Sequence, residues 1–445
     1  MAPFADEESG QEHAPLHASE RAPLLPSAAV KAPPPSSGIE SDRTRHMLGA
    51  AYMVAMGMCG VVLVALGSTL EELAEHCGRV STTIGSVFIA RGFGAVFGAV
   101  ASAQLYRAFH GNTVIVWALL ALSALLLWLP YVTNVWALHG AFLCLGLCTA
   151  VTDTGCQIMT RRAHGCRAGP WLGANTVAFG LSGALVPCIS YATDRLIIQY
   201  ALMSAMGVSA AIAFIALPTP EKQRGFIGKR PPPPPVTVGG SSGGSGLRGF
   251  VYLYRIEFTI GFMIFWLIGG KVGATAYLTQ YVADTGIIPD ARAPLLIAVL
   301  WLAITVGRIL GIQAQRTITL SKLHKQCAGL FIGGAAAAAL PLVLLHSAAA
   351  LWIAVALYGT LNGPCVGYCY DLNNRITFPS ETGMSIVMFG LNCGSSFIPF
   401  AISGLWDATQ WPSILFVFLV VSHLLPFPAL LTARRLHTKS LKGVA

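Results

Sequence analysis

Charged residues are scarce in this 445-residue sequence: Lys, Arg, Asp and Glu together make up 11% of it, whereas soluble globular chains carry about 25%. Hydrophobic residues make up 54%, and the mean hydropathy is +0.64. These values exclude an ordinary soluble domain and predict an integral, multi-pass membrane protein. The net charge of +9 does not indicate nucleic-acid binding, because the basic residues punctuate apolar runs instead of forming one patch.

Several motifs that would carry enzymatic chemistry are also missing. The sequence has no phosphate-binding Walker loop, no HExxH or GxSxG motif and no ligand spacing typical of zinc. We therefore expect no enzymatic activity, no cofactor and no metal site. The eleven cysteines fall mostly within apolar runs, which predicts small packing residues and no disulfide framework. The first 46 residues are polar and Pro-rich, so no cleavable signal peptide is expected.

What the sequence does contain is a series of apolar runs, each about long enough to cross a bilayer as a helix. Twelve such runs lie at 47–69, 82–105, 112–131, 135–159, 170–192, 196–217, 251–282, 292–313, 325–345, 349–371, 382–404 and 411–433. They predict an all-α polytopic membrane protein with twelve transmembrane helices. The run at 251–282 is long for one span, and we expect it to be tilted or broken near Gly269-Gly270.

A distinctive segment separates the sixth and seventh runs. The stretch "KRPPPPPVTVGGSSGGSG" is a proline run followed by a Gly/Ser run, and such a composition cannot form a core. We read it as a linker between two six-helix bundles. The predicted organisation is a disordered cytosolic tail (1–45), an N-terminal bundle (46–217), a cytosolic linker (218–249), a C-terminal bundle (250–435) and a short cytosolic tail (436–445).

The placement of Lys and Arg predicts the orientation of the chain in the membrane. If the N-terminus is cytosolic, twenty of the basic residues fall in or near cytosolic loops, whereas the opposite loops hold only Arg79, Arg195 and Arg292. Cytosolic loops carry an excess of Lys and Arg in most membrane proteins. The sequence therefore predicts that both termini lie in the cytosol.

The two halves echo each other weakly. "VAFGL" at 177–181 recurs as "VMFGL" at 387–391, and "ARGFG" at 90–94 is echoed by "GRILG" at 307–311. Twelve spans, a central linker and cytosolic termini resemble the major facilitator superfamily, whose two bundles rock around a central site. That family has an acidic residue among basic residues in the loop after its second span. The stretch "GAVASAQLYRAFHGN" keeps Gly98 and Arg107 but lacks the acid.

Asp153 is the first candidate for function, because an ionised group inside a span costs several kcal/mol unless it faces a cavity or a partner. It could bind a coupling ion or a substrate hydroxyl, or it could pair with Arg161 or Arg162 at the inner surface. The stretch "DTGCQ" resembles a span-four signature of fucose permease-like carriers and sodium-dependent glucose transporter-like proteins. This resemblance implies sugar recognition and cation coupling by Asp153 and Thr154, with Gln157 in place of the usual Asn.

The second half carries further candidates that resemble the same branch. "FVYLYRIEFTIGFMIFW" places Glu257 where an acid could titrate or bind a cation, or pair with Arg255. "LWLAITVGRILG" provides Trp301 and Arg308. Arg308 needs an anion, which could be substrate or a gate partner; Asp371 and Glu257 are candidates for that partner.

Lys271 lies well inside the seventh run and is either a ligand for an anionic substrate or a lysine that snorkels to the outer surface. We expect a break at the preceding glycines to give it a wet cavity. Asn175, Asn362 and Asn392 could contact a sugar, with Trp301 or Trp266 as a stacking aromatic, or could join helices by hydrogen bonds. The residues that we expect to act as gates or structural charges are Arg91, Arg107 and Asp371.

The N-terminal tail contains "ERAPLL", in which Glu20, Leu24 and Leu25 resemble the dileucine signal that clathrin adaptors bind on endosomal and lysosomal carriers. The chain is thus expected in an endosomal or lysosomal membrane, or in the plasma membrane. The leading hypothesis is a secondary carrier of a small polar solute such as a sugar, coupled to H⁺ or Na⁺. The alternatives are an organic-anion carrier of the same fold and a non-transporting receptor or scaffold.

Overall fold

The computed structural model describes residues 42–79, 84–164, 168–193, 195–220, 247–315, 318–344, 347–377 and 381–442, which belong to one compact unit. Within these ranges the regular structure is helical, and twelve helical spans are long and apolar enough to cross a membrane. The helices of the first half are α1 (Asp42–Ser68), α2 (Leu70–His76), α3 (Ser86–Ala108), α4 (Gly111–Trp128), α5 (Val135–His164), α6 (Ala168–Ala192) and α7 (Leu196–Ile215).

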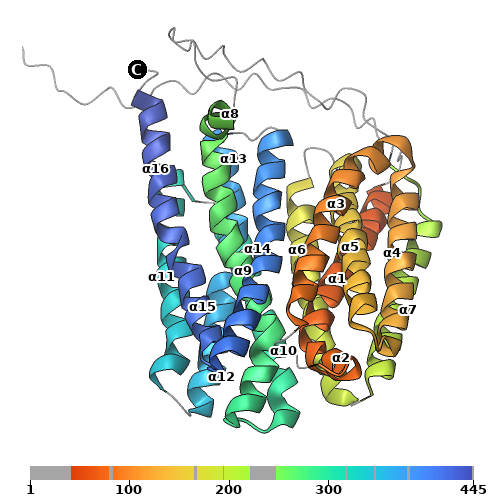
Figure 1. The fold of residues 1–445 in the computed structure, drawn as a ribbon. Helices are drawn as coiled ribbons and strands as arrows, with labels where there is room; N and C mark the ends of the chain where they lie inside the picture. Colours follow the sequence, from red (N-terminus) through yellow and green to blue (C-terminus); the bar gives the residue numbers. More distant parts are fainter. Residues whose placement is uncertain are drawn as a thin grey trace, which may run out of the picture. The chain divides into compact units, whose positions relative to one another are not determined.

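The helices of the second half are α8 (Leu247–Leu253), α9 (Arg255–Thr285), α10 (Ala293–Gln315), α11 (Leu320–Val343), α12 (Ala348–Asn362), α13 (Cys365–Thr377), α14 (Glu381–Thr409), α15 (Ile414–Leu424) and α16 (Pro426–Lys442). We call the side where α1 begins and α16 ends the tail side, and the side that carries α2 the far side (Figure 1). Helices are the expected solution, because a bilayer offers no water to satisfy backbone groups.

The two halves pack their helices in corresponding pairs. In the first half α1 packs on α6 and α3 on α5; in the second half α9 packs on α14 and α10 on α12. Glycine allows the closest of these approaches, since a Cβ at Gly60 would collide with the carbonyl of Phe179, and a Cβ at Gly394 would collide with the carbonyl of Phe265. Small residues at such crossings let helix backbones touch, which is the main way helices associate in membranes.

The halves meet along two seams of the same kind. One is formed by α3 and α14 and the other by α6 and α10, with a further contact between α1 and α9. Each seam therefore joins the second span of one half to the fifth span of the other. This arrangement places the "ARGFG" and "GRILG" segments, which carry Arg91 and Arg308, in the seam helices α3 and α10.

Two differences from the sequence prediction concern the seventh and tenth spans. The run at 251–282 is not broken at Gly269-Gly270: α9 is continuous to Thr285 and is followed by Gly286, a left-handed cap with φ of 60°. At about 1.5 Å per residue its 31 residues exceed the thickness of a bilayer core. The tenth run instead is divided at Gly363 into α12 and α13, because Pro364 cannot continue the helical hydrogen bonding.

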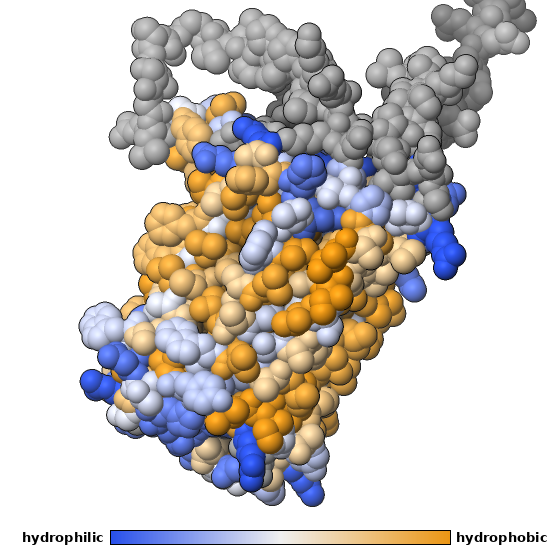
Figure 2. All heavy atoms as spheres, turned by 90° about the vertical axis from the view of Figure 1, so that its right-hand side faces the viewer, coloured by the Kyte–Doolittle hydropathy of each residue, from blue (hydrophilic) through white to orange (hydrophobic). Residues whose placement is uncertain are grey.

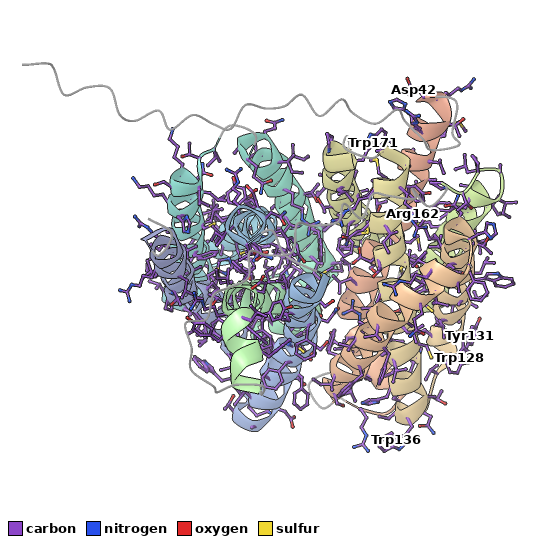
Figure 3. The ribbon with its side chains drawn as sticks, turned by 90° about the horizontal axis from the view of Figure 1, so that it is seen from above. Asp42, Trp128, Tyr131, Trp136, Arg162 and Trp171 are labelled. Atoms are coloured by element: carbon purple, nitrogen blue, oxygen red, sulfur yellow. The ribbon has the colours of Figure 1, made fainter. Side chains whose placement is uncertain are left out.

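The surface has the polarity of a membrane protein. Figure 2 shows an apolar band between two more polar ends on the face that carries the first half. Trp128, Tyr131 and Trp136 lie exposed at the margin of this half, with Trp136 82% exposed (Figure 3). Aromatic side chains of this kind prefer the membrane–water interface.

Two predicted features lie outside the described residues. The dileucine-like segment with Glu20, Leu24 and Leu25 precedes Asp42, and most of the predicted linker falls between 220 and 247. The cysteines that the structure describes are free.

Candidate functional site

The charged side chains at mid-depth come from four helices. Arg91 lies on α3, Asp153 on α5, Lys271 on α9 and Arg308 on α10. Asp153, Arg91 and Arg308 are partly exposed, whereas Lys271 is 3% exposed. Burial of so many charges in apolar spans is costly and needs compensation by partners, water or ligand.

Lys271 is enclosed by the aromatic side of α10. Its ammonium lies over the ring of Trp301, 5.4 Å from the ring centre. The Trp301 indole N–H donates to Thr275 Oγ1 at 3.2 Å, and the Thr275 hydroxyl in turn donates to the carbonyl of Lys271 at 2.9 Å. This closed set of contacts fixes the ring beneath the ammonium, and a desolvated cation over an aromatic face is stabilised by about 2 kcal/mol. The break expected beside Lys271 is wrong, because α9 is continuous through this position.

Arg308 connects the two halves through a main-chain atom. Its Nη1 donates to the carbonyl of Thr176 on α6 at 2.6 Å, and its guanidinium lies over the ring of Phe179 at 5.7 Å. Phe179 also contacts Trp301, with ring centres 5.9 Å apart. Gly180 makes this approach possible, because a Cβ there would collide with Thr305 Oγ1 and lie 3.2 Å from Arg308 Nη1.

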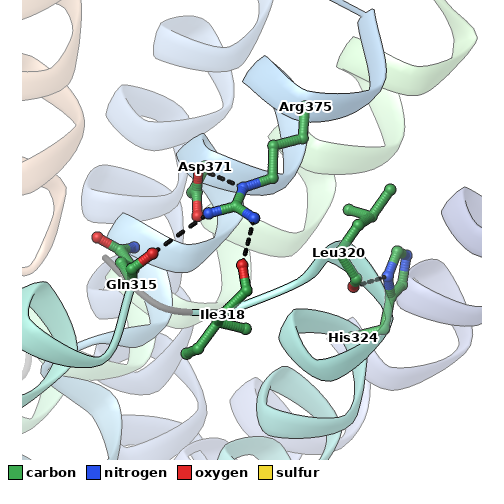
Figure 4. A network of polar contacts seen from close by, with 6 residues as sticks. All are labelled: Gln315, Ile318, Leu320, His324, Asp371 and Arg375. Carbon is green, nitrogen blue, oxygen red and sulfur yellow. Dashed lines mark hydrogen bonds and ion pairs between the residues drawn. The ribbon is translucent and has the colours of Figure 1, made fainter. Parts of the chain in front are cut away.

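The carboxylates proposed as partners of Arg308 lie elsewhere. Asp371 accepts a hydrogen bond from Arg375 Nε at 2.9 Å, and Arg375 also donates to the carbonyls of Gln315 and Ile318 (Figure 4). Glu257 packs against Gly383 at the start of α14. The prediction that Arg308 pairs with Asp371 or Glu257 is therefore wrong, since each acid is engaged nearer the tail side.

Asp153 lies on α5 in the first half and has no basic partner among the described residues. It accepts a hydrogen bond from Gln157 Nε2 at 2.9 Å, one helical turn away. Its carboxylate is close enough to Cys59 of α1 and Tyr370 of α13 to interact with them electrostatically. Arg162, offered as an alternative partner, donates instead to the carbonyl of Tyr106. Asp153 therefore faces residues of both halves without being neutralised by a cation.

The predicted asparagines take part in different contacts. Asn175 donates to Thr160 Oγ1 at 3.1 Å and so joins α6 to α5. Asn362 donates to the carbonyl of Leu267 at 3.2 Å within the second half. Asn392 is partly exposed in the α3–α14 seam and donates to a carbonyl of its own helix. Of the three, Asn392 lies where the two halves meet.

The remaining predicted residues are Thr154, Arg107 and Arg91. Thr154 is partly exposed next to Asp153, and Arg107 is exposed at the tail-side end of α3. Arg91 is partly exposed, but its buried Nε has no hydrogen-bond partner. Thr154 thus stands beside the candidate carboxylate, whereas Arg107 lies away from the mid-depth charges.

Sequence reasoning missed several residues of the site. Thr176 contributes a carbonyl, Phe179 and Tyr370 contribute rings, and Thr275 positions Trp301. The echo between "VAFGL" and "VMFGL" marked the segment that contains Phe179, although not its contact with Arg308. No sequence signal marks a main-chain acceptor, because every residue has the same carbonyl.

Together the fold and these charges define a polytopic helical membrane protein whose paired halves enclose ionisable groups. A family model described as Major Facilitator Superfamily matches residues 48–375, most of the chain. The chain belongs to the major facilitator superfamily, as the sequence resemblance indicated.

A curated relative and several solved structures are similar to this chain. The sodium-dependent glucose transporter 1 of Danio rerio is 23% identical over 145 residues, which are 31% of this chain but only 24% of that protein. The match to a crystal structure of the nucleoside transporter NupG covers 88% of this chain and 99% of the NupG chain, with a TM-score of 0.63 and 12% identity. The match to a D-xylose-proton symporter has a TM-score of 0.65 and 11% identity and covers 86% of this chain and 97% of the symporter. The match to the human organic anion transporter MFSD10 has a TM-score of 0.59 and 14% identity and covers 87% of this chain and 99% of that transporter.

Proposed function

We propose that this protein is a secondary active transporter of a small polar solute, driven by H⁺ or Na⁺. The observation that carries the proposal is the state of Asp153: a mid-depth carboxylate that is partly exposed and that, among the described residues, is hydrogen-bonded only to Gln157. A carboxylate in this setting can accept a proton or a cation without breaking an ion pair. A receptor or scaffold of the same fold would not need such a group.

Alternating access is supported by the way the halves meet on the far side. A Cβ at Gly67 would lie 3.1 Å from Thr275, and the rings of Phe88 and Tyr277 are 6.3 Å apart, so α1 and α3 are in contact with α9 there. With these contacts in place, partial exposure of Asp153 is best explained by access from the tail side. We propose that rocking of the halves exchanges this access for access from the far side.

The tail side is proposed to face the cytosol. Its loops carry most of the basic residues, in keeping with the positive-inside bias of membrane proteins. Under this assignment Asp153 is reached from the cytosol in the present conformation, and the ion that drives uptake enters after the seams on the far side separate.

The proposal predicts that Asp153→Asn abolishes concentrative uptake while leaving the protein folded. Asn keeps the hydrogen bond to Gln157 but can neither release a proton nor balance Na⁺. The measurement is solute accumulation in proteoliposomes with an imposed H⁺ or Na⁺ gradient, and we expect at least a tenfold loss. Asp407→Asn, at an exposed position at the far-side end of α14, is the matched control and should transport normally. Uphill uptake by Asp153→Asn equal to that of the unmodified protein would refute the role of this carboxylate.

A further inference from the structure

We infer that the solute carries an anionic group, a carboxylate or a phosphate, which binds between Lys271 and Arg308. This inference rests on the proposed transport function and names the chemical class of its substrate. It starts from an imbalance of charge at the contact between α9, α10 and α6. Lys271 and Arg308 are close enough to repel each other electrostatically, and no carboxylate among the described residues is paired with either.

Three acids of the second half have other contacts. Asp371 is held by Arg375, Glu257 lies against the start of α14, and Asp284 at the far side accepts hydrogen bonds from Gln280 and Trp406. Asp153, the acid nearest in depth, is bonded to Gln157. Lys271 and Arg308 thus have no counter-ion in the part of the chain that the structure describes.

Contacts around the two cations lower the free-energy cost of burying them without neutralising their charges. Lys271 is 3% exposed, and its ammonium makes no hydrogen bond or ion pair within the described part of the chain; it lies over the Trp301 ring. Arg308 uses one nitrogen for the Thr176 carbonyl, which leaves further N–H donors of its planar fork free. A buried lysine without a partner, beside an arginine with donors to spare, is an arrangement that an anion would complete.

The side chains around Lys271 and Arg308 indicate what the rest of such a solute can be. The partly exposed ring of Phe179 forms an apolar surface beside Arg308 and packs against the buried Trp301, and Thr305 adds a hydroxyl at the point where α6 crosses α10. A flat or ring-shaped solute with one anionic group would stack on the Phe179 ring while its charge meets Lys271 and Arg308. A neutral sugar could stack in the same way but would leave both cations uncompensated.

The test compares ligands that share a frame and differ in charge. Purified protein is heated in detergent with glucose, glucuronate or glucose 6-phosphate, and separately with benzyl alcohol, benzoate or phenyl phosphate, at matched ionic strength. We expect at least one anion to raise the unfolding temperature and its neutral partner not to do so, because a ligand that binds only the folded state stabilises it. The carboxylate and phosphate arms separate the two sources of charge. Equal shifts by neutral and anionic partners, or no shift by any anion, would overturn the inference.

Variants then locate the binding. Lys271→Gln and Arg308→Gln should each raise the ligand concentration for half-maximal stabilisation at least tenfold, whereas Lys325→Gln, the same change at an exposed position of α11, should not. An anion shift that survives both site variants would also contradict the proposal. The transport proposal fails separately: it is refuted if the stabilising anion is never accumulated against its gradient. Accumulation of a neutral solute that Lys271→Gln leaves unchanged would refute the anion inference alone.

Discussion

Lys271 shows how a single residue can be found from sequence while its setting is not. Its position inside an apolar run predicted a functional or snorkelling lysine, and the structure places it against Trp301 at mid-depth instead of near either surface. The supporting contact with Thr275 could not be predicted, because it joins residues 26 positions apart on different helices. Asp153 was predicted to be functional from the free-energy cost of placing an ionised group inside a span. Its hydrogen bond to Gln157 follows from their spacing of one helical turn.

At this scale we predict graded losses of stability at Trp301. Trp301→Phe removes the hydrogen bond to Thr275 and should cost about 1 kcal/mol. Trp301→Leu also removes the ring beneath Lys271 and should cost roughly a further 2 kcal/mol, the strength of a desolvated cation–π contact. Chemical unfolding in detergent micelles measures both. Trp117, which is 69% exposed, provides the matched pair Trp117→Phe and Trp117→Leu, for which the two losses should be small. Equal losses for the two Trp301 variants would show that the ring does not support the ammonium.

At the scale of the elements, run length and composition were enough to place all twelve spans, because a bilayer restricts a spanning segment to an apolar helix of about 20 residues. Breaks inside spans were harder to place. Gly269-Gly270 resembled a break, yet both glycines serve close packing of α9 against α14 and α15, whereas the break at Gly363-Pro364 was not predicted. A pair of glycines permits either outcome, and the neighbouring helices decide between them.

The helix crossings predict opposite effects for two glycine-to-alanine changes. Gly60→Ala should destabilise the protein by about 1–3 kcal/mol, because the new Cβ would collide with the carbonyl of Phe179 and part α1 from α6. Gly140→Ala should stabilise slightly, by about 0.5–1 kcal/mol, since nothing lies within 4 Å of that position on α5. Thermal unfolding of the two variants decides the matter. Gly60→Ala as stable as the unmodified protein would mean that the crossing is looser than described.

At the scale of the whole molecule, the far side brings like charges from both halves together. Burial raises the pKa of Glu71 on α2 above 4.5, and the nearby Glu75, Asp284 and Asp290 raise it further. Asp284 and Asp290 belong to the second half, near the end of α9 and the start of α10. Ionisation of Glu71 therefore disfavours the conformation in which α2 lies next to these residues, and protonation favours it.

The sign of this effect predicts a pH dependence of stability. At a pH below 4.5 Glu71 is protonated in both the folded and unfolded states, so its charge does not destabilise the fold. As the pH rises through the raised pKa of the folded state, the carboxylate becomes charged and the stability of the fold decreases. Glu71→Gln removes the charge, so its unfolding temperature should match that of the unmodified protein near pH 4 and exceed it near pH 7.5. Asp407→Asn, at an exposed position, should show no such divergence. A constant difference across the pH range would exclude the effect.

The link between Arg308 and Thr176 has a consequence for how this protein can be studied. Its acceptor is the main-chain carbonyl of residue 176, so any amino acid that keeps α6 helical preserves the bond. Alanine scanning of α6 would not detect this hydrogen bond, and an alignment would show no co-varying pair of positions for it. Only changes to the arginine, or a backbone substitution such as an ester at the following peptide, would report on this connection.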